Sequence, residues 1–143
     1  MPVIRRSSHR GHGGDPPPLR IPDLHGLTIL VVDDNDDALE ILSTFLQACG
    51  AETLSARSAI GAMAYVDTTP KLDAVVTDIS MPHMDGVEFV GKLRDHPSGR
   101  GVPVIGLTGF YERYVNANVF DAFMQKPVDL DDLGAVIRSL LGR

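Results

Sequence analysis

Five short apolar runs recur along the chain, and each is followed by a stretch with helical spacing or capping residues. We expect the runs to be strands, at residues 28–32, 52–55, 74–77, 102–107 and 122–125. The intervening stretches predict helices at residues 36–49, 58–69, 87–96 and 111–118, and from residue 129 onward, with Ser58 and Asp129 as N-terminal caps. Strands that alternate with helices in this way predict an α/β protein, with one parallel sheet and helices on both of its faces.

The first 24 residues have a different composition. They contain several glycines and the run Pro16-Pro17-Pro18, with few large apolar side chains. Such a segment buries too little apolar surface to offset the entropy lost on ordering. We therefore expect a flexible tail over residues 1–24 and one domain over residues 25–143, which is an ordinary domain size.

Charge and hydropathy exclude several classes of protein. The net charge is −6, and the first 26 residues carry four arginines against two aspartates, so the remainder stands at −8. An acidic body argues against nucleic acid as a direct partner. No apolar run approaches the roughly 18 residues of a membrane span, and no apolar stretch follows Arg5-Arg6 as in a secretory signal. We expect a cytoplasmic protein in which the single cysteine, Cys49, is a small buried hydrophobe.

Reactive side chains stand just past four of the five expected strands. In parallel sheets these strand ends meet at one edge, where ligands bind beside a topological switch point. The side chains are Asp33 and Asp34 after the first strand, Asp78 after the third, Thr108 after the fourth and Lys126 after the fifth. The sequence therefore predicts three carboxylates, one hydroxyl and one ammonium group at a common site.

This set of groups suits phosphoryl transfer. Crowded carboxylates repel one another unless a cation compensates them, and hard oxygen ligands suit Mg²⁺. A carboxylate can attack phosphorus, while Mg²⁺, an ammonium and a hydroxyl stabilise the charge on the transferred oxygens. Each residue alone has a structural interpretation, as a helix cap, a turn former, a polar strand end or a surface lysine. Their joint order at four strand ends favours the chemical interpretation.

Four segments resemble the signature stretches of response-regulator receiver domains of two-component signalling systems. The resemblance covers about residues 26–142 and implies a flavodoxin-like (βα)5 fold with strand order 2-1-3-4-5. The most specific stretch is Met81-Pro-His-Met-Asp-Gly86, which follows the aspartate-tipped third strand. The segments are residues 29–35 (ILVVDDN), 75–86 (VVTDISMPHMDG), 103–108 (PVIGLT) and 125–127 (QKP).

The resemblance also implies a role for each acidic residue. Asp78 is expected to be the phospho-acceptor. Asp34 and Asp78 are expected to ligate Mg²⁺ directly, with the backbone carbonyl of Ser80 as a third ligand, and Asp33 to act through a metal-bound water.

The resemblance implies a switch on the other side of the site. Lys126 is expected to pair with Asp78 and then with the phosphoryl group, and the Lys126-Pro127 peptide is expected to be cis. Thr108 would move toward the phosphoryl oxygens, and Phe123 would swing between outward and inward rotamers. The alternative for Phe123 is an ordinary core residue.

The implied partners are proteins. A sensor histidine kinase or a histidine phosphotransfer protein would supply the phosphoryl group, and an unknown protein would read the surface of the fourth helix, fifth strand and fifth helix. That face is a common homodimer surface in the family. The domain would catalyse only its own phosphorylation and dephosphorylation, so it is not a turnover enzyme. It would be a stand-alone regulator or the receiver of a hybrid kinase.

Two other classes of function remain as alternatives. One is a small Mg²⁺-dependent phosphatase with an aspartyl-phosphate intermediate. Haloacid-dehalogenase-type enzymes need a second aspartate two residues after the nucleophile, and Ser80 occupies that position. The other is a receiver-like interaction module that takes no phosphate, which the complete set of five reactive residues argues against.

Overall fold

A six-stranded parallel sheet forms the centre of the molecule. The computed structural model describes residues 3–5, 21–80, 86–109 and 119–143. The strand order is β1-β6-β5-β4-β2-β3. The five expected strands are present as β2 (Thr28–Val32), β3 (Glu52–Ala56), β4 (Ala74–Asp78), β5 (Val104–Thr108) and β6 (Ala122–Gln125). They lie in the expected order 2-1-3-4-5, so the flavodoxin-like fold is confirmed.

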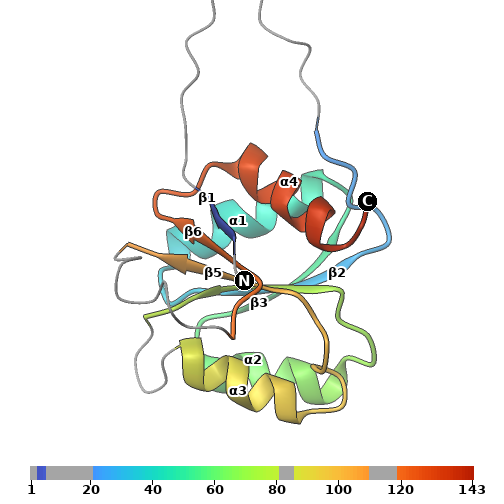
Figure 1. Cartoon of the computed structure of the whole chain (residues 1–143), viewed down its shortest axis with the longest axis vertical. Coiled ribbons are helices and arrows are strands. Elements are labelled where there is room, and N and C mark those ends of the chain that lie inside the picture. The colour runs from blue at the N-terminus through green and yellow to red at the C-terminus, as the bar shows by residue number, and fades with distance from the viewer. Residues whose placement is uncertain (1–2, 6–20, 81–85, 110–118) are drawn as a thin grey trace, which may run out of the picture.

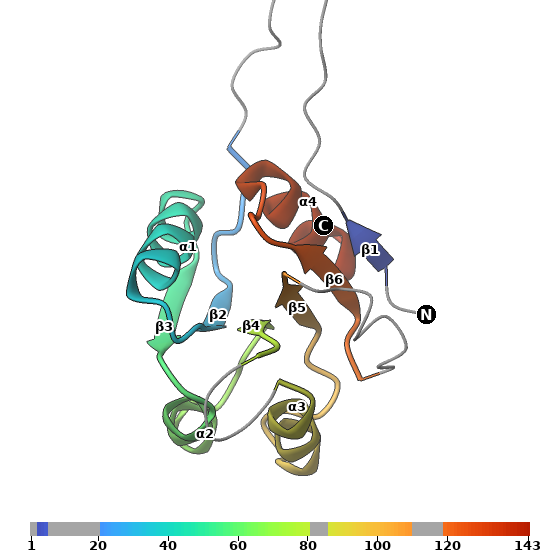
Figure 2. The ribbon, with the colours of Figure 1, turned by 90° about the vertical axis from the view of Figure 1, so that its left-hand side faces the viewer.

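Helices cover both faces of this sheet (Figure 1). Helices α1 (Asp36–Ala48) and α4 (Leu130–Leu140) pack on one face, and α2 (Ala59–Thr68) and α3 (Gly86–Asp95) on the other (Figure 2). Each face has its own apolar core, and alternate residues of β2 contribute to each. Burial on both faces explains why the strands read as continuous apolar runs. None of the helices in the described ranges is long and apolar enough to cross a membrane.

Side-chain caps fix where three helices begin. Asn35, Ser58 and Asp129 each accept a hydrogen bond from the backbone N–H three residues further on, at 2.9, 3.0 and 3.0 Å. Such caps satisfy N–H groups that have no partner inside the first helical turn. The caps predicted at Ser58 and Asp129 are confirmed. The helix expected at residues 111–118 lies outside the described residues.

The structure differs from the expected N-terminal tail at two points. Residues Val3–Arg5 form β1, which pairs in parallel with β6 at the edge of the sheet. Leu24 is fully buried, and its N–H donates to the carbonyl of Cys49 at 2.8 Å. Both depend on distant parts of the chain, an open strand edge and a core position, which local composition does not reveal. Cys49 itself is buried, as expected.

Gly86 gives a stability prediction at the start of α3. A Cβ at this position would lie 2.7 Å from the Cα of Ile79 and 3.0 Å from the carbonyl oxygen of Asp78. Because these are backbone atoms, Gly86→Ala is expected to lower the free energy of unfolding by about 1–3 kcal/mol. Gly91, in the same helix, has open space around its Cβ position. Gly91→Ala should therefore raise the free energy of unfolding by roughly 0.5–1 kcal/mol. Urea denaturation measures the free energy of unfolding of both variants. If both substitutions changed it in the same direction, the close backbone approach at Gly86 would not be what makes an added methyl group destabilising there.

Candidate functional site

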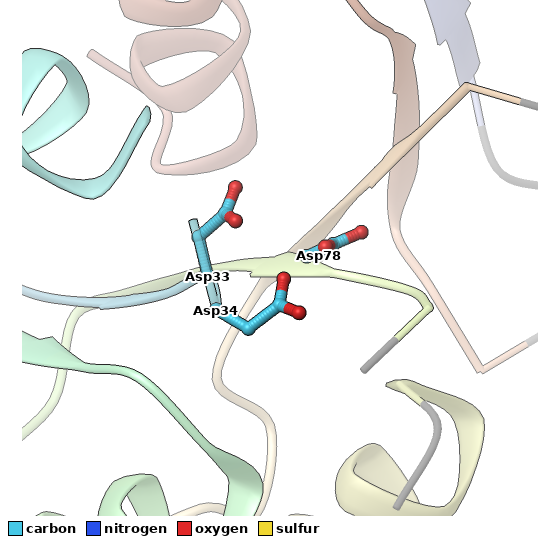
Figure 3. A group of neighbouring side chains, drawn as sticks. All are labelled: Asp33, Asp34 and Asp78. Atoms are coloured by element: carbon cyan, nitrogen blue, oxygen red, sulfur yellow. The ribbon is translucent and has the colours of Figure 1, made fainter. Parts of the chain in front are cut away.

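Three carboxylates meet at the carboxyl edge of the sheet. Asp33 and Asp34 directly follow β2, and Asp78 is the last residue of β4. Strands β2 and β4 are neighbours, with Val32 paired to Thr77, so the residues that follow them lie side by side. One carboxylate oxygen from each of the three aspartates lies within 4.8 Å of the others (Figure 3).

Backbone hydrogen bonds orient the two buried carboxylates. Oδ1 of Asp33 accepts from the N–H of Asn35 at 2.9 Å, and Oδ1 of Asp78 accepts from the N–H of Ser80 at 3.2 Å. Asp33 is fully buried and Asp78 is 7% exposed, whereas Asp34 is exposed. Each buried carboxylate therefore has one oxygen held by the main chain and a second oxygen turned toward other groups.

Lys126 faces those second oxygens. Its Nζ lies 3.1 Å from Oδ2 of Asp33 and 3.5 Å from Oδ2 of Asp78. The sequence predicted a pairing with Asp78, but the shorter contact is to Asp33, so the ammonium bridges the two carboxylates. The Lys126-Pro127 peptide is cis, as expected.

Thr108 lies beside Lys126 at the end of β5. The carbonyl of Thr108 accepts from the N–H of Lys126 at 2.8 Å, which ties the end of β6 to the end of β5. Thr108 is 3% exposed. Main-chain pairing of β5 and β6 thus brings the predicted hydroxyl and ammonium residues to the same edge as the carboxylates.

The site has perturbed proton equilibria. Burial raises the pKa of Asp78, the neighbouring Asp33 carboxylate adds to the rise, and Lys126 opposes it. Burial acts to lower the pKa of Lys126, but the attraction of Asp78 and Asp33 outweighs it and leaves that pKa raised. A cavity of about 230 Å³, lined mainly by apolar side chains, lies beside Lys126 and Asp33. Lys126 therefore stays charged at neutral pH, and Asp78 bears a cost for its charge.

The donor set fits a hard divalent cation. Three carboxylate oxygens converge, and one ammonium leaves part of their negative charge uncompensated. Mg²⁺ prefers such oxygens, keeps several waters, and binds through one or two carboxylates. Asp34 is the most accessible of the three carboxylates.

Two aromatic rings pack together at β6, the strand that leads to Lys126. Phe123 is 1% exposed, and its ring centroid lies 5.0 Å from that of Phe120. The structure thus records Phe123 in a buried position. Phe120 was missed from the sequence because it precedes the expected strand, although two aromatic residues three positions apart were a visible signal.

Comparison with known proteins shows the class of protein. Residues 29–138 match the family model of the response regulator receiver domain, and the chain belongs to that family. It is 35% identical to response regulator Rre1 of Synechocystis over 82% of this chain and 52% of Rre1. It is 27% identical to the polar-differentiation response regulator DivK of Brucella ovis over 80% of this chain and 96% of DivK.

A solved structure agrees with this assignment. The chemotaxis response regulator CheY4 of Vibrio cholerae superposes with a TM-score of 0.73 at 25% identity, over 80% of this chain and 98% of CheY4. Relatives such as Rre1 are about twice as long as the matched region, so activities of their other parts do not follow for this chain.

Proposed function

We propose that this chain is a phospho-accepting response regulator, in which Asp78 takes a phosphoryl group from a phosphohistidine with the help of Mg²⁺. The observation that carries the proposal is the contact of one ammonium with two buried carboxylates, 3.1 Å from Asp33 and 3.5 Å from Asp78. A purely structural ion pair needs one carboxylate. The third carboxylate, that of the exposed Asp34, lies within 4.8 Å of the other two, and reversible binding of a cation and a phosphoryl group would explain its presence there.

The transfer follows from the orientation of Asp78. One of its oxygens is held by the N–H of Ser80, and the other faces Lys126. A carboxylate oxygen of Asp78 forms the new bond to phosphorus as the bond from phosphorus to the donor imidazole nitrogen breaks. Lys126 stabilises the charge on the phosphoryl oxygens, and the Thr108 hydroxyl donates a hydrogen bond to one of them. Transfer to water then resets the domain, which on this proposal catalyses only its own phosphorylation and dephosphorylation.

The metal ligands are assigned as the resemblance implies. Asp34 and Asp78 would bind Mg²⁺ directly with the carbonyl of Ser80, and Asp33 would bind through a water. When bound, Mg²⁺ neutralises charge on the phosphoryl group during transfer. Asp33 is fully buried and contacts Lys126, which supports its assignment as the carboxylate that acts through a metal-bound water rather than as a direct ligand.

Metal binding gives a prediction that needs no phosphate. Mg²⁺ at about 100 times its dissociation constant is expected to raise the free energy of unfolding by roughly 2.7 kcal/mol. Asp34→Asn should lose most of this gain, because Asp34 is the accessible carboxylate of the cluster. Asp37→Asn, a first-turn aspartate of α1 outside the cluster, is the matched control. Thermal denaturation with Mg²⁺ or EDTA measures the gain, and an unchanged gain in Asp34→Asn would remove this residue from the metal site.

The output is a change of surface. Thr108 would move toward the phosphoryl oxygens and Phe123 would change its rotamer, so that phosphorylation shifts the population of two states of the surface around β6. Phe123 is buried and its ring packs against that of Phe120. Because close-packed side chains move between distinct arrangements, this packing supports a discrete rather than a gradual change of the Phe123 rotamer.

The partners are a sensor histidine kinase or a histidine phosphotransfer protein as donor, and a downstream protein whose identity is open. The similarity to the polar-differentiation response regulator DivK, over 96% of its length, supports the assignment as a response regulator. We place the protein in the cytoplasm, with residues 25–143 as its receiver unit.

The experiment is phosphorylation by acetyl phosphate, followed by intact mass. We expect one added phosphoryl group with Mg²⁺ and none with EDTA. If no mass is gained, beryllofluoride serves as a non-hydrolysable substitute for the phosphoryl group, with binding measured by the ¹⁹F signal. Failure of both would favour a receiver-like interaction module that works without phosphate.

A further inference from the structure

The sheet has one strand more than the five that the alternating pattern predicts. Strand β1 lies beyond β6, at the outer edge of the sheet (Figure 2). Its three residues pair in parallel with β6 in the register Val3 to Ala122, Ile4 to Phe123 and Arg5 to Met124. The N-terminal segment therefore occupies the backbone edge of the strand that leads to Lys126.

An open strand edge carries unpaired N–H and C=O groups that can pair with another chain, and proteins commonly cover such edges. The direction of the β6 amides shows what β1 covers. The N–H of Lys126 donates to Thr108 of β5. Because N–H groups alternate in direction along a strand, the amide of Phe123 points to the opposite side, toward β1. Without β1, β6 would be the edge strand of the sheet, and this amide would face outward.

We propose that Val3–Arg5 is a cap that occupies the β6 edge in cis and prevents that edge from pairing with a second copy of this chain. Two copies related by a twofold axis could pair their β6 edges antiparallel, since the same edge then serves both partners. The cap and the second copy compete for one set of backbone groups. The N-terminal segment thus controls self-association, independently of phosphorylation.

A long connection joins the cap to the body of the chain. Residues 6–20 join β1 to the next described residue, Ile21. Fifteen extended residues span roughly 50 Å, so the length of this segment is compatible with pairing to the β6 edge of its own copy or of a neighbouring copy. The cis arrangement predicts a monomer in which the pairing of β1 with β6 does not depend on protein concentration.

The test uses the full, unphosphorylated chain and the variant Ile4→Pro/Arg5→Pro. Only alternate N–H groups of β1 face β6, so replacing two adjacent residues removes at least one of them. Ser7→Pro/Ser8→Pro carries the same two prolines just outside β1 and is the matched control. Hydrogen exchange of the Phe123 amide reports the cap, sedimentation velocity reports the mass, and the Val76 amide in the central strand β4 checks that the fold is intact.

We expect wild type and control to be monomers with a protected Phe123 amide. The variant should exchange this amide at least about 10-fold faster when dilute, since a lost hydrogen bond of about 1.4 kcal/mol corresponds to a factor of 10. At higher concentration it should form a dimer. Equal exchange in wild type and variant, or a variant that stays monomeric at all concentrations, would overturn the proposal. Wild-type protection that disappears on dilution would show exchange of β1 between copies and overturn the cis arrangement.

Discussion

Asp78→Asn is expected to abolish phosphoryl uptake completely and, at the same time, to make the fold more stable. Loss of uptake follows because the amide that replaces the carboxylate has no nucleophilic oxygen to attack phosphorus. The other groups of the site stay in place, since Lys126 keeps its contact of 3.1 Å with Asp33. Intact mass after acetyl phosphate and Mg²⁺ measures uptake. Retained uptake would mean that another carboxylate accepts the phosphoryl group.

The gain in stability follows from the raised pKa of Asp78. Burial and the Asp33 carboxylate disfavour the charged form in the folded protein. Because the folded pKa lies above the unfolded pKa, the wild type at neutral pH bears a cost that disappears as the pH falls through the folded pKa. A neutral amide of similar shape avoids the cost. We expect the unfolding temperature of Asp78→Asn in EDTA to exceed that of the wild type by roughly 3 °C or more at pH 7.

The pH dependence provides the control for this gain. The difference in unfolding temperature should shrink as the pH is lowered, because Asp78 becomes protonated in the folded wild type while the variant has nothing to titrate there. Mg²⁺ should reverse the order by stabilising the wild type more. An unfolding temperature of Asp78→Asn below that of the wild type in EDTA would contradict a functional carboxylate held at a cost in stability.

Lys126→Ala is expected to have the second largest effect, on both chemistry and stability. Removing a preorganised positive group that stabilises developing charge costs typically about 10²–10³ in rate, and we expect phosphoryl uptake to slow by that factor. The fold should also lose about 2–3 kcal/mol, because the fully buried Asp33 and the nearly buried Asp78 would face each other without the ammonium. The loss stays below the roughly 3–5 kcal/mol of a fully buried pair because 32% of the Lys126 side chain is exposed.

Two lysine variants separate charge from packing. Lys126→Arg keeps a positive charge and should retain more of the stability than of the uptake rate, because the guanidinium differs in shape. Lys71→Ala removes an 82% exposed lysine whose Nζ lies 3.7 Å from Asp73, and it should change neither quantity by more than a small amount. Urea denaturation and the time course of intact mass measure the two effects. An uptake rate equal to wild type in Lys126→Ala would exclude this residue from phosphoryl transfer.

The sequence predicted most of what places the site. Continuous apolar runs indicated strands buried on both faces, and the parallel arrangement then required Asp33, Asp34, Asp78, Thr108 and Lys126 to meet at one edge. These inferences succeed because strand periodicity and helix caps are local properties of the chain. Strand β6 has the bounds that the sequence predicted, and Ser58 and Asp129 cap their helices as predicted.

What the sequence could not predict depends on tertiary contacts. Strand β1 exists because β6 offers an open edge, and nothing in Val3–Arg5 indicates that distant partner. The shorter contact of Lys126 with Asp33 than with Asp78 depends on the depth of each carboxylate. The packing of Phe120 against Phe123 depends on how the chain enters β6.

The central claim is that Asp78 carries the phosphoryl group, and reduction of the phosphorylated chain by borohydride tests it most directly. An aspartyl phosphate is an activated acyl group, which borohydride reduces to the alcohol and so converts aspartate to homoserine. Peptide mass spectrometry then locates the modified position among Asp33, Asp34, Asp78 and every other carboxylate. We predict homoserine at position 78 alone, formed only when Mg²⁺ and acetyl phosphate were both present. Homoserine at another position, with residue 78 unchanged, would contradict the proposed function.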